Sequence, residues 1–298
     1  MYRYLSILII CLFFFNGCAQ KKGNDYVITI ETSYGNMVAI LYDDTPKHKS
    51  NFIKLAQEKF FDSLLFHRVI EEFMIQGGDP NSKKPKPEQP LGTGGPGYTI
   101  DAEINPLYFH DKGALSAARL SDQVNPKKAS SGSQFYIVQG KKYTDEELSQ
   151  LEQSIRYGKK NQALRDVLGL PECADIRQQV MEKQQQNDGA WLTSFFEKSD
   201  TLITQFKKEY SLFSFSDEQK QHYKEFGGAP HLDGDYTVFG KVIQGLDVID
   251  KIAAVPKGPG DRPAEDIRMF ITVQEMSKNK IEKTYGYVYP ENKSRANK

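Results

Sequence analysis

The sequence is poor in cysteine, and its cysteines and histidines are scattered. Only three cysteines occur in 298 residues, and none forms a CxxC or CxxxC pair. Cys11 and Cys18 lie in or just after an apolar N-terminal stretch, which leaves Cys173 alone in the rest of the chain. An internal disulfide framework is therefore excluded, so the fold must depend on its hydrophobic core. The five histidines show no metal-ligand spacing, and we expect neither a metal site nor a cofactor.

An excess of charge of one sign is also missing. Lysine plus arginine and aspartate plus glutamate both number 39, so the formal net charge is zero. Such a chain has no overall field that would attract nucleic acid or an anionic membrane, and we expect no nucleic-acid partner. With 39% hydrophobic and 26% charged residues, the composition is typical of a globular protein. No long heptad pattern indicates assembly, so we expect a monomer.

The N-terminus has the pattern of a targeting segment. Arg3 precedes an apolar stretch at residues 5–15, which is too short to span a bilayer. The following Gly17-Cys18 resembles a bacterial lipoprotein signal, which predicts a signal peptide at 1–17 and a lipidated tether at 18–25 with the lipid on Cys18. The expected location is the cell envelope, as a periplasm-facing lipoprotein anchored to a membrane. An ordinary cleaved signal peptide and an uncleaved anchor are the alternatives.

The next residues alternate between apolar and polar side chains, which is typical of β-strands. Tyr26, Ile28 and Ile30 share one parity, and a second alternating run at 37–41 follows a Gly35-Asn36 turn, so a β-hairpin is predicted. Thr45-Pro46 predicts a helix start, because proline at the first helical position loses no hydrogen bond. Further strands are expected at 65–69, 114–118, 134–138, 236–242 and 267–273, with a short helix at 246–252.

Residues 141–226 are polar and have helical periodicity. Thr144 with Glu147, and Ser216 with Gln219, have the spacing of capping boxes, and Gly227-Gly228 should end the last helix. Two interpretations of this segment remain open. It is either a solvated insertion whose aromatic residues, among them Trp191, pack on each other or on the β body, or an arm that recruits unfolded clients or a partner.

Five sequence blocks occur in the order in which the cyclophilin family has them. In chain order they are FHRVIEEFMIQGGD (66–79), GTGG (92–95), GALSAAR (113–119), GSQFYI (132–137) and LDGDYTVFGKV (232–242). The chain therefore resembles a cyclophilin-type peptidyl-prolyl cis–trans isomerase. The resemblance implies a mainly β fold, a closed antiparallel eight-stranded β-barrel capped by two helices. This barrel should comprise 26–140 and 227–277, with the helical insertion at 141–226 and a polar tail at 278–298.

The residue types in the block 66–79 suit proline isomerisation. Rotation about an X-Pro amide bond crosses a barrier of about 18–20 kcal/mol, because the amide loses its resonance as it twists. A catalyst therefore needs an apolar pocket that holds the proline ring and a hydrogen-bond donor that stabilises the twisted amide more than the planar one. Arg68 is the candidate donor, because its guanidinium stays charged and has five N–H groups. Phe73 and Met74 offer apolar surface, and Gln76 can hold the Arg68 fork while binding substrate backbone. Arg68 and Gln76 are therefore the predicted catalytic residues.

The resemblance implies the remaining substrate-binding residues. Tyr136 and Leu232 complete the proline pocket, Ala118 and Arg119 lie where the family binds the residues preceding proline, and Gly92 lies near the neighbouring subsite. Two further positions depart from the eukaryotic pattern, because His231 stands in place of Trp and Tyr236 in place of His. The missing indole predicts weak binding of cyclosporin.

Less specific interpretations exist for several of these residues. Arg68 could be a surface ion-pair residue, Phe73 and Met74 could belong to the core, and His67 is interpreted as structural because isomerisation moves no proton. Two functions from different classes follow. The chain either accelerates X-Pro isomerisation while exported proteins fold, or it is a proline-peptide-binding or holdase module without useful turnover. In both cases the partners are proline-containing, unfolded exported polypeptides, and the membrane is reached through the lipid.

Overall fold

The computed structural model describes residues 23–86 and 90–289, so Cys18, the predicted signal peptide and the end of the predicted tail lie outside the described residues. The chain divides into two compact units. One contains residues 26–274, and the other combines the residues up to Asp25 with those from Glu275 onward.

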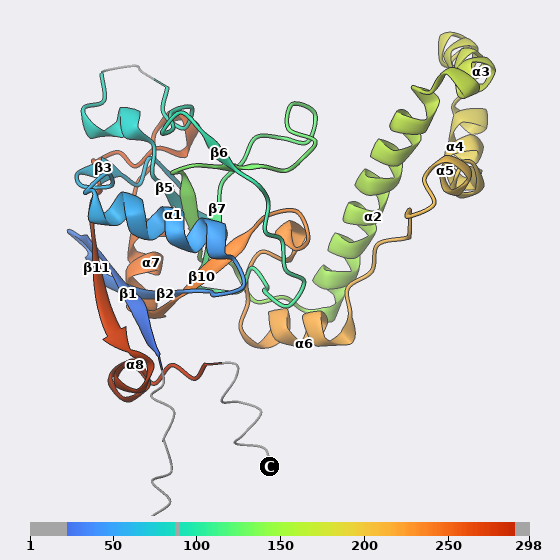
Figure 1. The fold of residues 1–298 in the computed structure, drawn as a ribbon. Coiled ribbons are helices and arrows are strands. Elements are labelled where there is room, and N and C mark those ends of the chain that lie inside the picture. Colours follow the sequence, from blue (N-terminus) through green and yellow to red (C-terminus); the bar gives the residue numbers. More distant parts are fainter. Residues whose placement is uncertain (1–22, 87–89, 290–298) are drawn as a thin grey trace, which may run out of the picture. The chain divides into compact units, whose positions relative to one another are not determined.

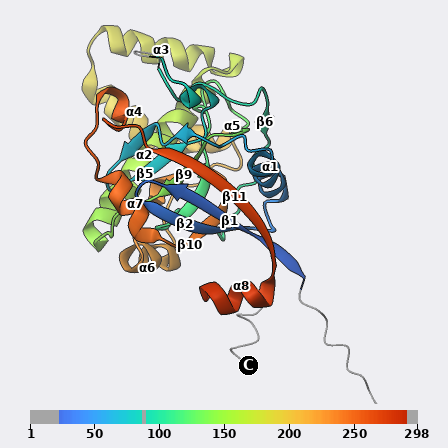
Figure 2. The ribbon, with the colours of Figure 1, turned by 90° about the vertical axis from the view of Figure 1, so that its left-hand side faces the viewer.

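The larger unit is built on a curled antiparallel sheet (Figures 1 and 2). Nine strands pair in the order β3-β11-β1-β2-β10-β7-β9-β5-β4, and β6 pairs with β8 in a separate small sheet. The strands are β1 (Asn24–Thr32), β2 (Gly35–Leu41), β3 (Leu64–Leu65), β4 (Arg68–Ile70), β5 (Met74–Gly77), β6 (Thr99–Ile100), β7 (Ala114–Ala117), β8 (Ser130–Ser131), β9 (Phe135–Val138), β10 (Val238–Gln244) and β11 (Arg268–Ser277).

The expected closed eight-stranded barrel is therefore corrected to a half-barrel of mixed α/β character. The prediction treated residues 65–69 as one strand. In the structure this segment divides into β3, which pairs with β11, and β4, which pairs with β5. The two pieces form opposite ends of the strand order, so the hydrogen-bonded sheet stays open between them.

The alternation of β1 and β2 places one set of side chains in the core. Ile28 pairs with Ala39 and Ile30 with Met37, and all four side chains are buried in the main hydrophobic core. The predicted Gly-Asn turn is wrong by two residues, because Gly35 and Asn36 already belong to β2. Ser33 and Tyr34 form the turn, and the Thr32 hydroxyl donates to the Gly35 carbonyl there.

Two helices, α1 (Pro46–Gln57) and α7 (Leu246–Ala253), supply the other side of this core. Phe52 of α1 stacks on Phe61 with ring centroids 4.9 Å apart and meets Phe135 of β9 edge-on at 5.4 Å. Ile249 and Ile252 of α7 are fully buried in the same cluster. The sheet and both helices therefore share one apolar interior. Both helices lie where the sequence predicted them.

Residues 141–226 form five α-helices within the larger unit. They are α2 (Asp145–Leu168), α3 (Ala174–Gln185), α4 (Gly189–Lys198), α5 (Asp200–Phe206) and α6 (Asp217–Glu225). Both predicted capping boxes are present, at the starts of α2 and α6. We call residues 141–226 the helical segment.

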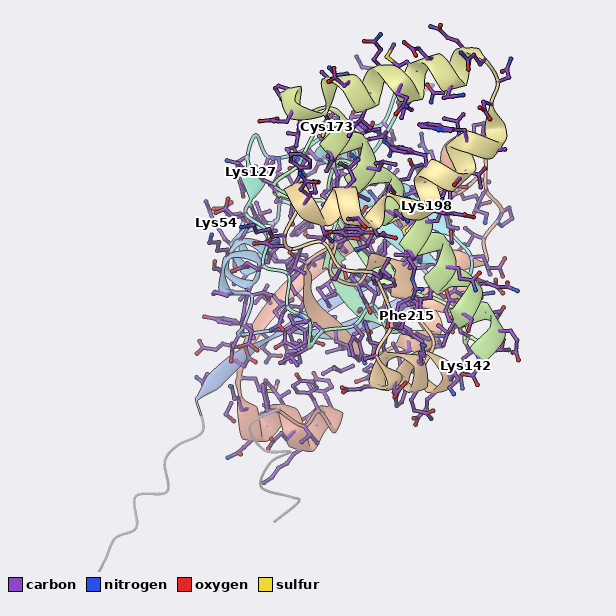
Figure 3. All side chains as sticks on the ribbon, turned by 90° about the vertical axis from the view of Figure 1, so that its right-hand side faces the viewer. Lys54, Lys127, Lys142, Cys173, Lys198 and Phe215 are labelled. Atoms are coloured by element: carbon purple, nitrogen blue, oxygen red, sulfur yellow. The ribbon has the colours of Figure 1, made fainter. Side chains whose placement is uncertain are left out.

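The helical segment has two small cores of its own. Leu148, Phe215 and Tyr223 are buried together near α6, and Ala163, Leu164 and Ile203 near α5. Figure 3 labels Phe215 and also Cys173, a buried free thiol in the short turn η2 (Pro171–Cys173) between α2 and α3. The rings of Trp191 and Phe195 stack on each other at 5.1 Å, so part of the segment's aromatic surface is satisfied internally.

The smaller unit contains a helix that the sequence analysis missed. Residues 278–285 form α8 (Lys278–Tyr285) within the predicted polar tail, and the Ser277 side chain caps its N-terminus. The Tyr289 hydroxyl donates to Asp25 at 3.0 Å, and Asn24 donates to Glu275 at 2.9 Å. Within residues 23–86 and 90–289, no helix combines the length and apolar character needed to cross a bilayer.

Candidate active site

The candidate site lies on the outer face of the curled sheet. Side chains alternate between the two faces of a strand, so Val69, Ile75 and Ile137 point into the main core. Their neighbours of opposite parity, including Met74 and Tyr136, belong to a second apolar cluster. Two-residue periodicity along three adjacent strands thus brings the candidate residues to one surface.

A tight hairpin positions the central pair. β4 and β5 are antiparallel, with Arg68 opposite Gln76 and Ile70 opposite Met74. The connection needs a left-handed residue, which is Glu72 with a φ of 62°. The hairpin closes when the Phe73 amide donates to the Ile70 carbonyl at 3.1 Å. The short block 66–79 thereby places a cation, an amide and two apolar side chains side by side.

A chain of amides orients the Arg68 guanidinium. Its Nη1 donates to the Gln76 Oε1 at 3.3 Å, and the Gln76 Nε2 donates to the Gln134 Oε1 at 3.1 Å. Gln134 in turn donates to the carbonyls of Gly92 at 2.9 Å and Gly94 at 2.7 Å. Each amide has its donor and acceptor direction fixed by the next group, so the acceptor facing Arg68 is fixed as well.

A carboxylate faces the guanidinium from another part of the chain. The Asp261 Oδ2 lies 3.7 Å from the Arg68 Nε, in the short turn η4 (Pro259–Asp261). The Arg68 side chain is 43% exposed and that of Asp261 46%, so solvent screens this ion pair strongly. Gln76 and Asp261 thus contact the Arg68 guanidinium at two of its nitrogens, Nη1 and Nε.

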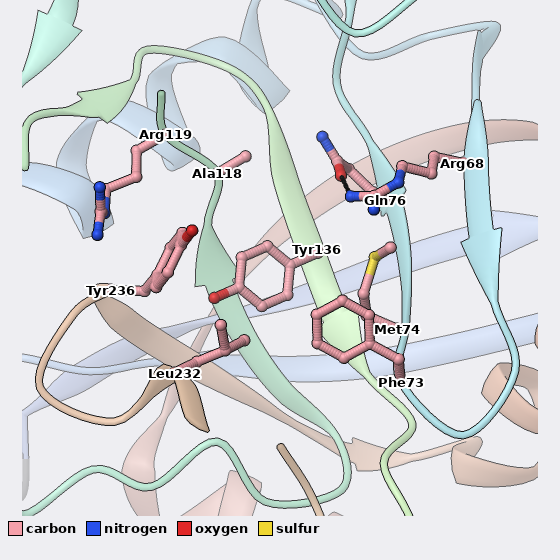
Figure 4. Close-up of a pocket in the computed structure, with 9 residues that line it drawn as sticks. All are labelled: Arg68, Phe73, Met74, Gln76, Ala118, Arg119, Tyr136, Leu232 and Tyr236. Atoms are coloured by element: carbon pink, nitrogen blue, oxygen red, sulfur yellow. Dashed lines mark hydrogen bonds between the residues drawn. The ribbon is translucent and has the colours of Figure 1, made fainter. Parts of the chain in front are cut away.

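The pocket beside Arg68 has a volume of about 150 Å³. Figure 4 shows Phe73 and Met74 on the Arg68 side, Leu232 and Tyr236 on the opposite side, and Tyr136 between them. Nine residues line it, all of them predicted from the sequence: Arg68, Phe73, Met74, Gln76, Ala118, Arg119, Tyr136, Leu232 and Tyr236. A slot of mixed character, with Phe73, Met74 and Leu232 as apolar walls and the Arg68 guanidinium at its edge, is suited to a small apolar ring that carries a polar group.

Arg119 lines the pocket, but its guanidinium contacts other groups of the protein. The guanidinium lies 4.3 Å above the Tyr236 ring, and its Nε donates to the Asp235 carbonyl at 2.8 Å. Its side chain is only 5% exposed. Arg119 therefore fixes the Tyr236 ring, and its backbone and stem remain for contact with a ligand.

Two predicted residues, Gly92 and His231, lie beside the pocket and do not line it. The Gly92 amide donates to Asp79, and its φ of 97° favours glycine, at a point where a Cβ atom would lie against the His67 ring. The His231 ring is 5.2 Å from the Phe73 ring, so it extends the apolar rim on that side.

Burial keeps two titratable groups near the pocket, His67 and Tyr136, in their uncharged forms near neutral pH. Burial lowers the pKa of His67 below its ordinary range, with a smaller opposing effect from Asp79. Burial raises the pKa of Tyr136 well above its ordinary range, so that hydroxyl remains protonated. In the part of the chain that the structure describes, no three His, Cys, Asp or Glu side chains gather as a metal would require.

Sequence reasoning missed two contributors to this geometry. Gln134 belongs to the GSQFYI block, so its place in a family motif could have marked it as a candidate. Its hydrogen bonds to Gln76 and to the Gly92 carbonyl could not be predicted from the motif. Asp261 follows a Gly-Pro-Gly stretch with no recognisable motif, and its approach to Arg68 depends on the tertiary fold.

Comparison with known families agrees with this arrangement. Residues 27–159 and 197–273 match the family described as cyclophilin type peptidyl-prolyl cis-trans isomerase/CLD, and residues 160–196 fall outside the match. More than half of the chain is therefore covered, and the chain belongs to the cyclophilin-type isomerase family. It is an enzyme of the peptidyl-prolyl cis–trans isomerase class.

Two bacterial relatives match most of this chain, one over nearly its whole length and one over part of a longer protein. A protein of Staphylococcus saprophyticus named as a peptidyl-prolyl cis-trans isomerase is 29% identical over 252 residues, covering 83% of this chain and 91% of that protein. A Streptococcus pyogenes protein named as a bifunctional phosphatase/peptidyl-prolyl cis-trans isomerase is 31% identical over 80% of this chain. The chain spans only 37% of that longer relative.

Solved structures also show a likeness. A cyclophilin type isomerase of Cryptosporidium parvum superposes with a TM-score of 0.49 at 20% sequence identity, covering 85% of this chain and 98% of that one. A second structure of the same protein, in the presence of the dipeptide Ala-Pro, gives a TM-score of 0.48.

Proposed function

We propose that Arg68 carries the catalysis, by donating a hydrogen bond that stabilises the twisted X-Pro amide while the proline ring occupies the adjacent pocket. The observation that carries this proposal is the position of Arg68 at the edge of the apolar slot, with Nη1 held by Gln76. As the C–N bond rotates, the prolyl nitrogen becomes pyramidal and regains a lone pair. A donor aimed at this region binds the twisted state more strongly than the planar one.

The pocket residues serve to hold the ring. Phe73, Met74, Tyr136 and Leu232 bury the pyrrolidine, and the remaining peptide extends along Ala118 and Arg119 toward Gly92. Gln76 has two roles in this proposal, because it fixes the guanidinium and offers an amide to the substrate backbone. Isomerisation requires no proton transfer, so the neutral His67 ring, which lies next to Gly92, is assigned a structural role.

A proline-isomerisation assay on the wild type and Arg68→Ala tests this mechanism. The wild type should accelerate isomerisation of a succinyl-Ala-Ala-Pro-Phe p-nitroanilide peptide, and the variant should lose most of that rate while its circular dichroism spectrum is unchanged. Equal, negligible rates in both proteins would leave only the binding-module function.

We further propose that the enzyme acts on exported proteins from a lipid anchor at Cys18 in the cell envelope, facing the periplasm. Support comes from the sequence alone, where a basic residue, an apolar stretch and Gly17-Cys18 follow in the order of a lipoprotein signal. The full chain should incorporate labelled palmitate and enter the detergent phase on Triton X-114 separation, and Cys18→Ser should do neither. Labelling that persists in Cys18→Ser would contradict the assignment.

A further inference from the structure

A short loop at residues 232–236 carries two of the pocket residues. Leu232 ends the turn η3 (Pro230–Leu232) and Tyr236 follows four residues later, and both line the pocket. Between them stand two carboxylates, Asp233 and Asp235. We call residues 232–236 the wall loop, because its position sets the width of the pocket opposite Arg68.

The helical segment holds the first carboxylate. The Tyr223 hydroxyl of α6 donates to Asp233 at 2.7 Å, and the Gln219 Nε2 of the same helix donates to it at 3.2 Å. From the sheet side, the backbone amide of His110 donates to Asp233 at 3.0 Å, and the ring Nδ1 of His110 lies 2.9 Å from the same carboxylate oxygen. The Asp233 side chain is 8% exposed and Tyr223 is fully buried, so little solvent competes for these contacts.

The second carboxylate is held from α2. The Lys159 Nζ lies 3.4 Å from Asp235, and Lys128 of the neighbouring loop also pairs with it. Burial would raise the pKa of Asp235, but the hydrogen bond from Lys128 and the charge of Lys159 outweigh it and hold the pKa below the ordinary range. Both acidic side chains of the wall loop are thus bound to donors from the helical segment.

From these contacts we infer that the helical segment is a working part of the active site, which positions the wall loop and so determines how tightly the proline pocket closes. This inference rests on the proposed function of that pocket. Leu232 is adjacent to Asp233, and Tyr236 is adjacent to Asp235, so a weaker hold on either carboxylate lets the neighbouring pocket side chain shift. Tyr223 and Lys159 are positioning residues, because neither lines the pocket.

The expected effect falls on substrate binding. The wall loop grips the proline ring in the planar and the twisted amide alike, whereas Arg68 on the opposite side is untouched. Loss of uniform binding raises KM and leaves kcat nearly unchanged. A loss of overall fold stability would instead lower the active fraction, and would leave KM as it is.

The helical segment offers matched controls for both contacts. Tyr210 donates to Asp200 at 3.0 Å and Lys183 pairs with Asp188 at 2.9 Å, and neither pair touches the wall loop. Tyr223→Phe is therefore compared with Tyr210→Phe, and Lys159→Met with Lys183→Met. Lys159→Arg keeps the charge and should restore the wild-type behaviour.

Two readouts are measured on each full-length variant, KM and kcat in the isomerase assay and the Kd of the same proline peptide by NMR titration. Tyr223→Phe should raise KM and Kd by roughly five- to tenfold and Lys159→Met by about threefold, with kcat within about twofold. The distal controls and Lys159→Arg should match the wild type.

Equal peptide affinity in the wall-loop variants and their controls would overturn the inference. A wild type that binds the peptide without turnover would refute the proposed function alone, because Kd still reports on the wall loop. If Tyr223→Phe does not fold, the Lys159 series decides, since that side chain is 45% exposed and its loss cannot unfold the core.

Discussion

Arg68 and Gln76 face each other across the β4–β5 hairpin, and the guanidinium Nη1 donates to the amide Oε1 at 3.3 Å. Strand register fixes this pair, because the two residues are direct cross-strand neighbours. Gln134 and the carbonyls of Gly92 and Gly94 then determine which way the Gln76 amide points. The Arg68 guanidinium is therefore held in place at the pocket by contacts within the fold.

Removing the Gln76 amide should loosen Arg68 without removing it. Gln76→Ala is expected to lower kcat/KM roughly ten- to a hundredfold, because a hydrogen bond to a charged group contributes about 1.5–3 kcal/mol. Gln162→Ala is the matched control, since that amide oxygen accepts from the Arg165 guanidinium at 2.7 Å within α2, away from the pocket. Equal kcat/KM values for the two variants in the isomerase assay would contradict a role for Gln76 in holding Arg68.

Neutralising Asp261 should have a smaller effect of the same sign. Asp261→Asn removes the charge that faces the Arg68 Nε, and screened surface pairs contribute at most about 1 kcal/mol, so kcat/KM should fall by up to about fivefold. The melting temperature should be unchanged because both side chains are nearly half exposed. An increase in activity would mean that Asp261 competes with substrate for the guanidinium.

The buried histidine next to Arg68 should make stability depend on pH. Burial lowers the pKa of His67 below its ordinary value of 6.5. Above that pH the ring is neutral in both the folded and the unfolded chain, and it contributes no pH dependence. Below that pH the His67 ring is protonated in the unfolded chain but still neutral in the folded chain. The free energy of unfolding therefore decreases as the pH is lowered, by up to about 1.4 kcal/mol per pH unit for this group.

Urea unfolding of the wild type and His67→Gln between pH 5 and 7 checks this sign. Burial lowers the pKa of His48 as well, so the variant should keep part of the slope. The pH dependence should be shallower in His67→Gln. An identical slope in both proteins would show that His67 accepts its proton in the folded state.

Cyclosporin should bind weakly. His231 stands where the eukaryotic pattern has Trp, and its ring lies 5.2 Å from Phe73 at the rim of the pocket. It offers less apolar surface than an indole, and burial lowers its pKa so that it is mostly neutral. His231→Trp should therefore increase affinity in an isothermal titration. Tight inhibition of the wild type would contradict this expectation.

The nine residues that line the pocket could be named from the sequence because two simple rules bring them together. Strand alternation puts Met74, Gln76 and Tyr136 on one face, and the ordered blocks supply the other residues of the pocket on that face. The pocket-lining residues come from these blocks, so short-range pattern carried most of the information about the site.

Pairing between distant segments could not be predicted in the same way. The division of 65–69 into β3 and β4 follows from their different partners, β11 and β5. The approach of Asp261 to Arg68 and of Tyr223 to Asp233 is likewise tertiary. The helix α8 was missed because only Ile281 is buried on it, which leaves almost no apolar periodicity to detect.

NMR exchange spectroscopy on a proline peptide tests the central claim most directly, since it reports binding and turnover in one sample. With wild-type protein, cross-peaks between the cis and trans forms should appear on a timescale far shorter than the tens of seconds of uncatalysed exchange. With Arg68→Ala, the peptide signals should still shift on titration while the exchange peaks disappear. Exchange peaks of equal strength in Arg68→Ala would contradict the account.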